Sequence, residues 1–246
     1  MQKTLILIPS RLSASRLPNK PLLKINGKSI ISLVVDRAKR SKLGEVIVAT
    51  EDNKILNEVK KNGGKAIITS NIHKTGTDRI YECLSKLKKR NIDYIINLQG
   101  DEPNIDINDL KRLYILTKKN NSDMATLASE IHNKKIYKDK NIVKVITNLK
   151  LNKNNFPYAK DFRRLITSGK NIYHHLGVYI YKVKILKKFI NLRQSENELS
   201  NKLEQMRAID NDIKINVALA NKPSIGIDTI EDYVALKKIM EYKSSI

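Results

Sequence analysis

The sequence predicts an α/β protein with a mainly parallel sheet. Strand-like and helix-like segments alternate through the first half of the chain, and several strand-like runs, such as EVIVAT at 45–50, are almost wholly apolar. Strands buried on both faces and joined by crossover helices form parallel sheets. Three unusually polar loops, at 10–20, 73–79 and 99–103, each follow such a segment. Since ligands bind at the carboxyl ends of parallel strands, we expect these loops to line one crevice.

The elements of the first half follow from hydrophobic spacing. Residues 3–9 read as a strand that stops at Pro9, and 29–40 as a helix with Ile30, Leu33 and Val34 on one face. Thr77 could cap a helix over 77–90. The other expected elements are strands over 45–50, 65–69 and 93–98, a helix over 53–61, and a helix that begins after Asp106.

The second half is less regular. We expect strands over 124–131, 142–147, 173–181 and 213–220, a helix over 195–209 with Leu199, Leu203 and Met206 inward, and a closing helix over 229–242. Thr229 and Asp232 have the spacing of a capping box. Because no linker-like composition separates the halves, we predict one domain over 1–246, with the polar segment 151–170 as a projecting excursion that could mediate dimer contacts.

Composition narrows the functional class. The chain has 246 residues, a formal net charge of +22 and one cysteine, Cys83. No apolar run reaches the ~20 residues that span a bilayer, and no secretory signal is visible, so we expect a cytoplasmic protein. The charge could indicate nucleic-acid binding, but lysines are spread over most expected helices, which favours solvated surfaces. The excess of positive charge still favours small anionic substrates.

The loop in LIPSRLSASRLPNKPL (7–22) has the chemistry of a phosphate site. Arg11, Arg16 and Lys20 follow the first strand together with three serines. Arginine forks and lysine point charges bind triphosphates. INGKSI at 25–30 resembles the end of a P-loop, but Leu22 stands where the first glycine is required, and no GxGxxG follows a strand. Side-chain cations would therefore hold the phosphates, and a solvated turn is the alternative.

Two carboxylates could hold a metal ion. NLQGDEP (97–103) places Asp101 at the end of a strand, and Asp228 lies in GIDT. Mg²⁺ is commonly held by one or two carboxylates together with substrate phosphate oxygens. The alternatives are an acidic turn closed by Pro103 and a helix-start acid beside Thr229.

Two further motifs carry polar side chains. In HHLGVYIY (174–181) the adjacent histidines point to opposite faces of a strand, which argues against a zinc pair. One inward histidine near Tyr179 could hydrogen-bond a polyhydroxyl ligand. In LEQMR (203–207), inward packing of Leu203 and Met206 leaves Glu204, Gln205 and Arg207 facing solvent by default.

Together these motifs resemble the 3-deoxy-manno-octulosonate cytidylyltransferases, the CMP-Kdo synthetases. The resemblance runs over nearly the whole chain, through IPSRLSASRLPNKPL, HKTGTDR, NLQGDEP, MATLASEIHN, HHLGVYIY, LEQMR and GIDT. The first and third motifs also occur, more loosely, in CMP-sialic acid synthetases and other sugar nucleotidyltransferases. The resemblance implies a three-layer α/β/α fold of the nucleotide-diphospho-sugar transferase type, usually a homodimer. It also implies formation of CMP-Kdo and pyrophosphate from CTP and 3-deoxy-D-manno-octulosonate (Kdo), for lipopolysaccharide biosynthesis.

The resemblance also implies roles for individual residues. Arg16, Lys20, Asp101 and Asp228 would be catalytic, and the two aspartates would hold Mg²⁺. The nucleotide would be bound by Arg11, Ser13, Ala14, Lys20, Thr75, Gly76, Thr77 and Arg79. Arg11, Arg16 and Lys20 would contact its phosphates. The sugar acid would be faced by Gln99, His175, Tyr179, Glu204 and Gln205.

The chain departs from the family pattern at two points. Asn19 replaces the usual glycine before Lys20, and Tyr158 falls near an expected arginine in NFPYAKDFRR. Charge alone suggests Arg163 or Arg164 as the source of the missing cation. The alternative substrates are therefore 8-amino-Kdo or a sialic-type nonulosonate, and a non-catalytic basic protein that binds nucleic acid is the alternative from another class.

Overall fold

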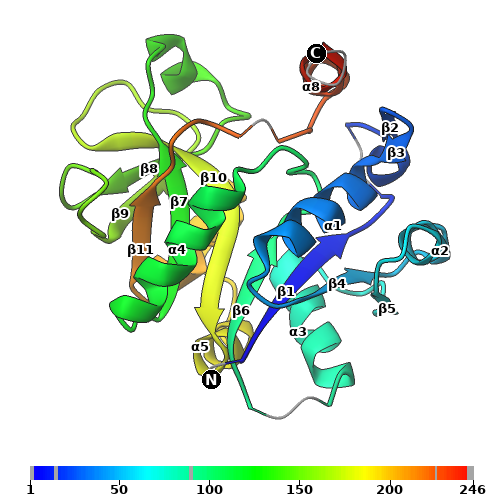
Figure 1. The fold of residues 1–246 in the computed structure, drawn as a ribbon. Helices are drawn as coiled ribbons and strands as arrows, with labels where there is room; N and C mark the ends of the chain where they lie inside the picture. Colours follow the sequence, from blue (N-terminus) through cyan, green and yellow to red (C-terminus); the bar gives the residue numbers. More distant parts are fainter. Residues whose placement is uncertain (1–2, 14–15, 89–90, 225, 243–246) are drawn as a thin grey trace. The chain divides into compact units, whose positions relative to one another are not determined.

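The computed structural model describes residues 3–13, 16–88, 91–224 and 226–242 (Figure 1). Contacts divide the chain into two compact units. The first comprises Met1–Ile92, Ile96–Ile107 and Ser224–Ile246, and the second Asp93–Ile95 and Asn108–Pro223. The single cytidylyltransferase domain expected from the sequence stays a prediction.

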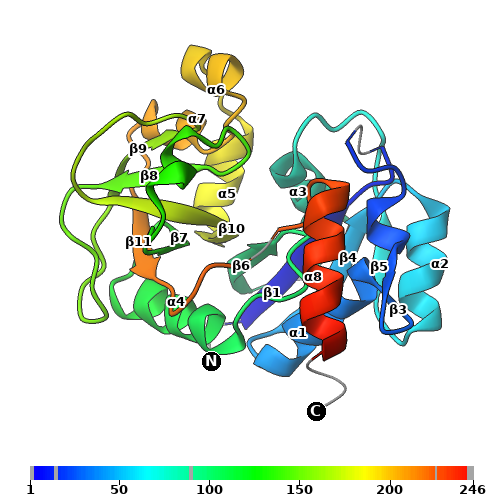
Figure 2. The ribbon, with the colours of Figure 1, turned by 90° about the horizontal axis from the view of Figure 1, so that it is seen from above.

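The first unit contains a sheet in the strand order β6 (Ile92–Leu98, with Asp93–Ile95 in the second unit), β1 (Lys3–Ser10), β4 (Glu45–Thr50), β5 (Ala66–Ile68). β1 pairs in parallel with β4, and β4 with β5, as the apolar runs predicted. Figures 1 and 2 show α1 (Ile30–Ser41) on one face of this sheet and α3 (Gly76–Lys86) on the other. α2 (Asn53–Lys61) connects β4 to β5.

A small hairpin precedes α1. β2 (Lys24–Ile25) and β3 (Lys28–Ser29) pair antiparallel around Asn26 and Gly27, which have φ values of 50° and 75°. Positive φ at both central residues is the requirement of a two-residue hairpin turn, and Asn-Gly meets it. The INGKSI segment therefore contains a hairpin turn and is not a P-loop. The Asn-Gly pair in the sequence indicated this turn.

The C-terminal helix α8 (Ile230–Tyr242) packs within the first unit. Leu236 of this helix joins a buried cluster that also contains Leu17, Ile25, Ile30 and Ile227. The predicted capping box at its start is confirmed, because the Thr229 amide donates to Asp232 and the Asp232 amide donates to Thr229 Oγ1. A short 3₁₀ helix, η1 (Lys20–Leu22), ends the polar loop after β1.

The second unit contains a mixed sheet. β11 (Ile215–Leu219) runs parallel to β7 (Met124–Ser129), whereas β10 (Ile172–Lys182) is antiparallel to β7 and to β8 (Lys144–Thr147), and β9 (Ala159–Arg163) is antiparallel to β8. The helical elements are α4 (Ile107–Lys119, Ile107 itself in the first unit), η2 (Lys134–Lys138), α5 (Val183–Ile190), α6 (Glu196–Asn201) and α7 (Met206–Ile209). The predicted α/β class is confirmed.

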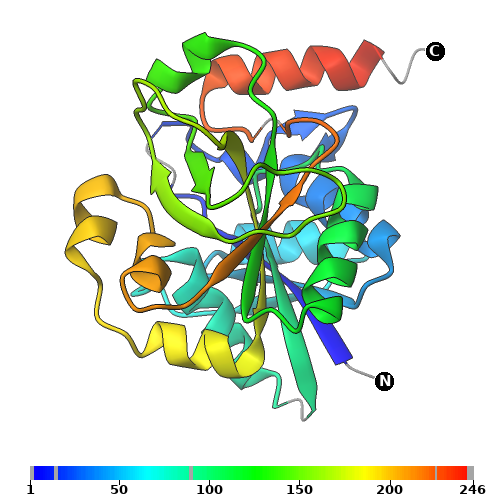
Figure 3. The same ribbon diagram turned by 90° about the vertical axis from the view of Figure 1, so that its left-hand side faces the viewer.

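Three local expectations are wrong. The helix over 195–209 is broken into α6 and α7, which Figures 2 and 3 show as separate helices, because Lys202 takes a left-handed conformation with φ of 52°. Leu199, expected inward, is exposed. Thr75, not Thr77, caps α3, since its hydroxyl accepts a hydrogen bond from the Asp78 amide.

The segment 151–170, expected to be irregular, contains β9, and its Leu151 and Phe162 are buried. Its predicted role in a dimer stays a prediction. Among the described residues, none of the helices combines the length and the apolar character needed to cross a lipid bilayer.

Candidate functional site

A cavity of about 330 Å³ lies in the first unit, and all three predicted polar loops line it. The carboxyl ends of β1 and β6 and the start of α3 form its walls, as expected for a parallel sheet. The lining residues are Pro9, Ser10, Arg11, Ser13, Arg16, Lys20, Pro21, His73, Lys74, Thr75, Gly76, Arg79, Gln99, Gly100, Asp101 and Asp228. Ala14, expected near the base, lies outside the described residues.

Lys20 brings the two predicted metal-binding carboxylates together. Its Nζ lies 2.7 Å from Asp101 Oδ2, 3.3 Å from Asp228 Oδ1 and 2.6 Å from the backbone oxygen of Ile227. Burial alone would lower the pKa of Lys20, but the two carboxylates outweigh burial and raise it above the usual 10.5. Lys20 is therefore protonated, and its ammonium group contacts both carboxylates.

The residue before Lys20 explains one departure from the family pattern. Asn19 has φ of 56° and ψ of 19°, which is the left-handed region. Glycine enters this region freely, and asparagine is among the few other residues that do so at low cost. Replacing the usual glycine by Asn19 therefore keeps the turn that presents Lys20.

Arg16 belongs to the same charged group. Its guanidinium lies 3.3 Å from Asp228 Oδ1, and about half of its side chain is exposed. Exposed ion pairs contribute little to stability, so Arg16 can change partners at small cost.

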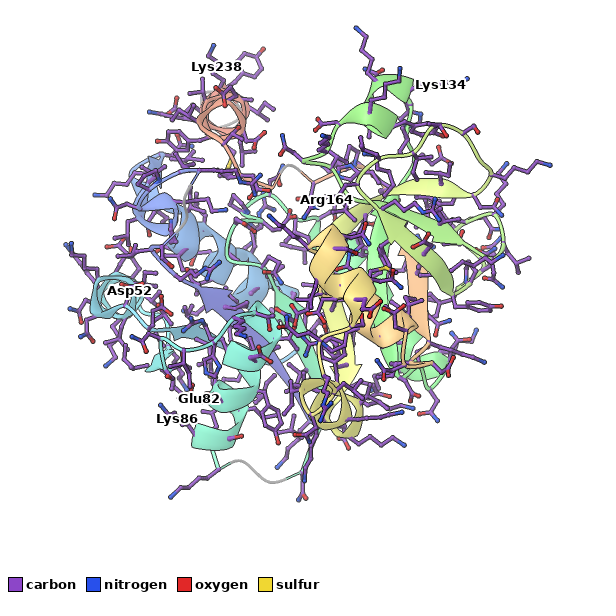
Figure 4. The ribbon with its side chains drawn as sticks, turned by 180° about the vertical axis from the view of Figure 1, so that it is seen from behind. Asp52, Glu82, Lys86, Lys134, Arg164 and Lys238 are labelled. Atoms are coloured by element: carbon purple, nitrogen blue, oxygen red, sulfur yellow. The ribbon has the colours of Figure 1, made fainter. Side chains whose placement is uncertain are left out.

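The loop after β1 is also held by Asp52, which lies at the start of α2 (Figure 4). Its carboxylate accepts a hydrogen bond from the Leu12 amide at 2.9 Å.

The donor set suits a divalent ion that also has other ligands. In the described part of the chain, no group of three or more histidine, cysteine, aspartate or glutamate side chains could hold a metal by itself. Asp101 and Asp228 converge on one cation position, and the remaining ligands of an ion there would be phosphate oxygens or water. This arrangement fits Mg²⁺, which prefers few carboxylates and a substrate phosphate.

The loop before α3 forms the opposite wall of the cavity. A Cβ on Gly76 would lie 3.2 Å from Pro9 Cγ, so only a glycine fits comfortably between the loop and β1. Thr77 is buried on α3 and does not line the cavity, unlike Thr75 and Gly76. Gly100 is needed for a similar reason, because its Cβ would approach the Pro9 oxygen to 2.9 Å. Close packing of strand ends thus explains Gly100.

Arg79 is buried, and its guanidinium has partners within the protein. It donates to Thr69 Oγ1 at 2.7 Å and to the Ser70 oxygen at 3.1 Å, and it forms an ion pair with Glu51. Arg79 still lines the cavity, so its contacts brace the wall to which it belongs. The sequence analysis missed Glu51, which carries no local signal for this pairing.

Glu82 on α3 holds the loop that precedes this helix. Its carboxylate accepts from the Ser70 amide at 2.8 Å and pairs with His73, which lines the cavity, and with Lys86, which lies beside it on the helix (Figure 4). Burial would raise the pKa of Glu82, but hydrogen bonds from Lys86, His73 and Ser70 lower it to about 2. The sequence analysis did not single out Glu82.

Gln99 lines the first-unit cavity, whereas the other predicted sugar-facing residues belong to the second unit. There, the rings of His175 and Tyr179 on β10 lie 5.3 Å apart, and His175 Nε2 is 3.0 Å from Thr126 Oγ1. Burial lowers the pKa of His175 to about 3, so the ring is neutral near pH 7. Burial, with smaller contributions from Tyr181 and Glu204, raises the pKa of Tyr179 well above 10.

The Tyr179 hydroxyl is a buried donor with no hydrogen-bond partner among the described residues. Leaving such a group unpaired costs free energy, which marks this position as one that can receive a ligand. Glu204 and Gln205 lie just before α7, and Gln205 is buried, as is Arg207. The default expectation that these side chains face solvent is therefore wrong for Gln205 and Arg207.

Arg207 is held by a buried ion pair. Its guanidinium makes two hydrogen bonds to Glu198, at 2.7 and 2.5 Å, and lies 4.8 Å from the Phe189 ring centre. Both charged side chains are almost fully buried. This pair anchors α7 and the residues just before it to α6.

The cations suggested as replacements for the family's arginine have other contacts. Arg163 pairs with Asp161, and Arg164 (Figure 4) donates to the backbone oxygens of Lys140, Asn201 and Lys202 at 3.0–3.1 Å. Tyr158 is partly exposed, with Lys214 Nζ 6.0 Å from its ring centre. Both arginines therefore have polar partners within the second unit.

Comparisons with known proteins show the family to which the chain belongs. A model of the cytidylyltransferase family matches residues 5–215. The curated 3-deoxy-manno-octulosonate cytidylyltransferase of Thermodesulfovibrio yellowstonii is 40% identical over 249 aligned residues, which cover 96% of this chain and 98% of that protein.

Solved structures give the same result. A CMP:2-keto-3-deoxy-manno-octonic acid synthetase complexed with CTP superposes with a TM-score of 0.88 at 33% identity, covering 98% of this chain and 100% of the other. An apo UDP-glucose pyrophosphorylase superposes with a TM-score of 0.70 at 13% identity, covering all of both chains, which shows a shared fold alone. The predicted nucleotide-diphospho-sugar transferase type of fold is confirmed.

Proposed function

Because this chain belongs to the cytidylyltransferase family, we propose that it activates Kdo with CTP, giving CMP-Kdo and pyrophosphate. The relative from Thermodesulfovibrio yellowstonii and the synthetase solved with CTP support this substrate pair, since both match nearly the whole chain. The resemblance seen in the sequence motifs is confirmed by the same matches, and the enzyme is a nucleotidyltransferase. The relatives' names favour Kdo over 8-amino-Kdo or a nonulosonate.

The observation that carries the proposal is the convergence of Lys20, Asp101 and Asp228 on one point of a cavity that three arginines also line. A cationic wall beside paired carboxylates is what a nucleoside triphosphate and its divalent ion require. Arg11, Arg16 and Lys20 would bind the phosphates, and Asp101 with Asp228 would hold Mg²⁺. Ser13, Thr75, Gly76 and Arg79 would surround the nucleoside, with Ala14 and Thr77 proposed on the resemblance alone.

The reaction is an attack of the anomeric hydroxyl of Kdo on the α-phosphorus of CTP, from which pyrophosphate departs. Bound Mg²⁺ would polarise the phosphate and lower the pKa of the attacking hydroxyl. Lys20 would exchange its carboxylate contacts for phosphate oxygens and, with Arg16, stabilise the charge that develops on pyrophosphate. No covalent enzyme intermediate is needed, because positioning and electrostatics supply the catalysis.

The resemblance assigns the sugar acid to Gln99 and to four residues of the second unit. His175 is uncharged near pH 7 and Tyr179 keeps its proton, so both can exchange hydrogen bonds with sugar hydroxyls. Glu204 and Gln205 would complete this set.

We further propose that the enzyme is a cytoplasmic homodimer that supplies lipopolysaccharide biosynthesis. Its single cysteine, Cys83, is buried and unpaired, which suits a reducing compartment. Light scattering during size-exclusion chromatography tests the dimer directly, and a monomeric mass at micromolar concentration would contradict it.

Pyrophosphate release tests the reaction. We expect rapid release with CTP, Mg²⁺ and Kdo, slower release with 8-amino-Kdo or a nonulosonate, and none without a divalent ion. The nucleic-acid alternative predicts no CTP consumption and a polyanion affinity that falls steeply with salt. Equal turnover of all three sugar acids would remove the assignment to Kdo.

A further inference from the structure

A buried hydrogen bond joins the two segments that carry the paired carboxylates. The Ser224 hydroxyl lies 2.5 Å from Glu102 Oε2 and 2.8 Å from Asn104 Oδ1. Glu102 follows Asp101 directly, and Ser224 stands four residues before Asp228. Both side chains are more than nine-tenths buried, and all of these residues belong to the first unit.

Backbone contacts extend this connection toward the carboxylates. The Ile227 amide donates to the Asp101 oxygen at 3.0 Å, and the Ile227 oxygen accepts from Lys20. Gly226 packs so closely that a Cβ there would lie 3.2 Å from Glu102 Oε1. The backbone before Asp228 is therefore tied to the Asp101 turn at Ser224 and at Ile227, with Glu102 filling the space between.

Burial of the Glu102 carboxylate costs free energy. Burial of a charge costs free energy unless hydrogen bonds compensate, and Glu102 is adjacent to another acid. Glu102 is not among the residues that line the cavity, whereas its hydrogen bond with Ser224 connects it to the segment that leads to Asp228. Its position suits a residue that acts on the metal site through the backbone.

We propose that Glu102 and Ser224 are positioning residues that set the separation of Asp101 and Asp228 for a divalent ion. This inference rests on the proposed function, because it needs the two aspartates to bind the ion. Partners that orient metal ligands typically change metal affinity about 10- to 100-fold when removed. Neither residue touches the nucleotide or the reacting atoms in this proposal.

Mn²⁺ serves as the probe. Its binding to the full chain is measured by water-proton relaxation enhancement with saturating CTP and no sugar acid, against Mn²⁺–CTP alone. We expect Ser224→Ala and Glu102→Ala to bind Mn²⁺ about 10-fold more weakly, and to need about 10-fold more Mg²⁺ for half-maximal turnover. Glu102→Gln keeps a hydrogen-bond acceptor for Ser224 and should behave like the unaltered chain.

Ser41→Ala is the matched control. Ser41 is a buried serine of the same unit whose hydroxyl donates to the Ala38 oxygen at 2.6 Å, and it does not line the cavity. The Ser41→Ala variant should lower the free energy of unfolding in urea by about as much as Ser224→Ala does. Its affinity for Mn²⁺ should stay unchanged. If Glu102→Ala does not fold, Ser224→Ala decides the question.

Two results would overturn the proposal, and they differ. Mn²⁺ affinities of Ser224→Ala and Glu102→Ala equal to that of the unaltered chain would remove the positioning role and leave the proposed function intact. An unaltered chain that binds no Mn²⁺ and turns over without a divalent ion would remove the metal from the proposed function and this inference with it.

Discussion

The cavity of the first unit and the β10 region of the second unit offer a ligand opposite chemical surroundings. Around Lys20 the side chains are charged, and they are partly exposed, as at Arg16 and Asp228. Around His175 and Tyr179 they are buried among aromatic rings, and burial keeps both groups neutral near pH 7. A polyanion is matched by charges that can change partners, whereas a polyhydroxyl ligand is matched by fixed, uncharged donors and acceptors.

The largest expected effect concerns the buried ion pair of Arg207 with Glu198 in the second unit. Arg207→Met should lower the free energy of unfolding by about 3–5 kcal/mol, because Glu198 stays buried without its partner. Urea unfolding measures this. Arg16→Met is the control, since its exposed pair with Asp228 should change stability by less than about 1 kcal/mol. Equal losses in both variants would break the contrast between buried and exposed charge.

The next effect is catalytic. Asp101→Ala should lower turnover about 100-fold while the chain stays folded, because loss of one preorganised charge raises the barrier by roughly 3 kcal/mol. Pyrophosphate release at saturating CTP and Kdo measures the rate, and a urea midpoint close to that of the unaltered chain shows that the fold survives. Near-normal release would remove Asp101 from the metal role.

Tyr179→Phe should separate substrate binding from stability. The hydroxyl has no hydrogen-bond partner among the described residues, so its removal should not destabilise the chain. If it binds the sugar acid, the KM for Kdo should rise about tenfold while the KM for CTP stays unchanged. A variant with an unchanged KM for Kdo would show that the tyrosine is only a packing residue.

The smallest effect is a pH dependence. The pKa of His175 falls from 6.5 to about 3 on folding, so the unfolded chain takes up the proton first as the pH is lowered. Stability should therefore be full above pH 6.5 and decline as the pH falls toward 3, by up to about 1.4 kcal/mol per pH unit.

His175→Asn should reduce the loss of stability between pH 6.5 and 5.5, measured by urea unfolding. His132→Asn is its control, because His132 is largely exposed and its replacement should leave the slope as it was. A slope that is the same in all three chains would show that His175 is not buried as a neutral ring.

The sequence predicted the elements that depend on local spacing. β4 and α2 have the expected bounds, and the loops that follow β1, β5 and β6 line one cavity because parallel strands end at the same edge. Asp101 and Asp228 could be proposed from their motifs, but their meeting at Lys20 could not, since hydrophobic periodicity carries no information on side-chain partners.

Long-range contacts account for most of what was missed. The partners Glu51 of Arg79 and Glu198 of Arg207 are ordinary acids in the sequence, and only the fold brings each pair together. The break at Lys202 was hidden because Leu203 and Met206 continue a helical spacing across it. The break also turns α7 away from the line of α6, so Gln205 and Arg207 are buried and do not face solvent as a continuous helix would predict.

The lysine cation between Asp101 and Asp228 means that the chain carries its own counter-ion. Two acids from distant parts of the sequence would repel each other, and this internal positive charge removes that cost before any ligand arrives. A divalent ion that binds both acids has to displace the lysine, which then needs another anion nearby. In the proposed function the triphosphate would be that anion, so metal and nucleotide should enter as one unit.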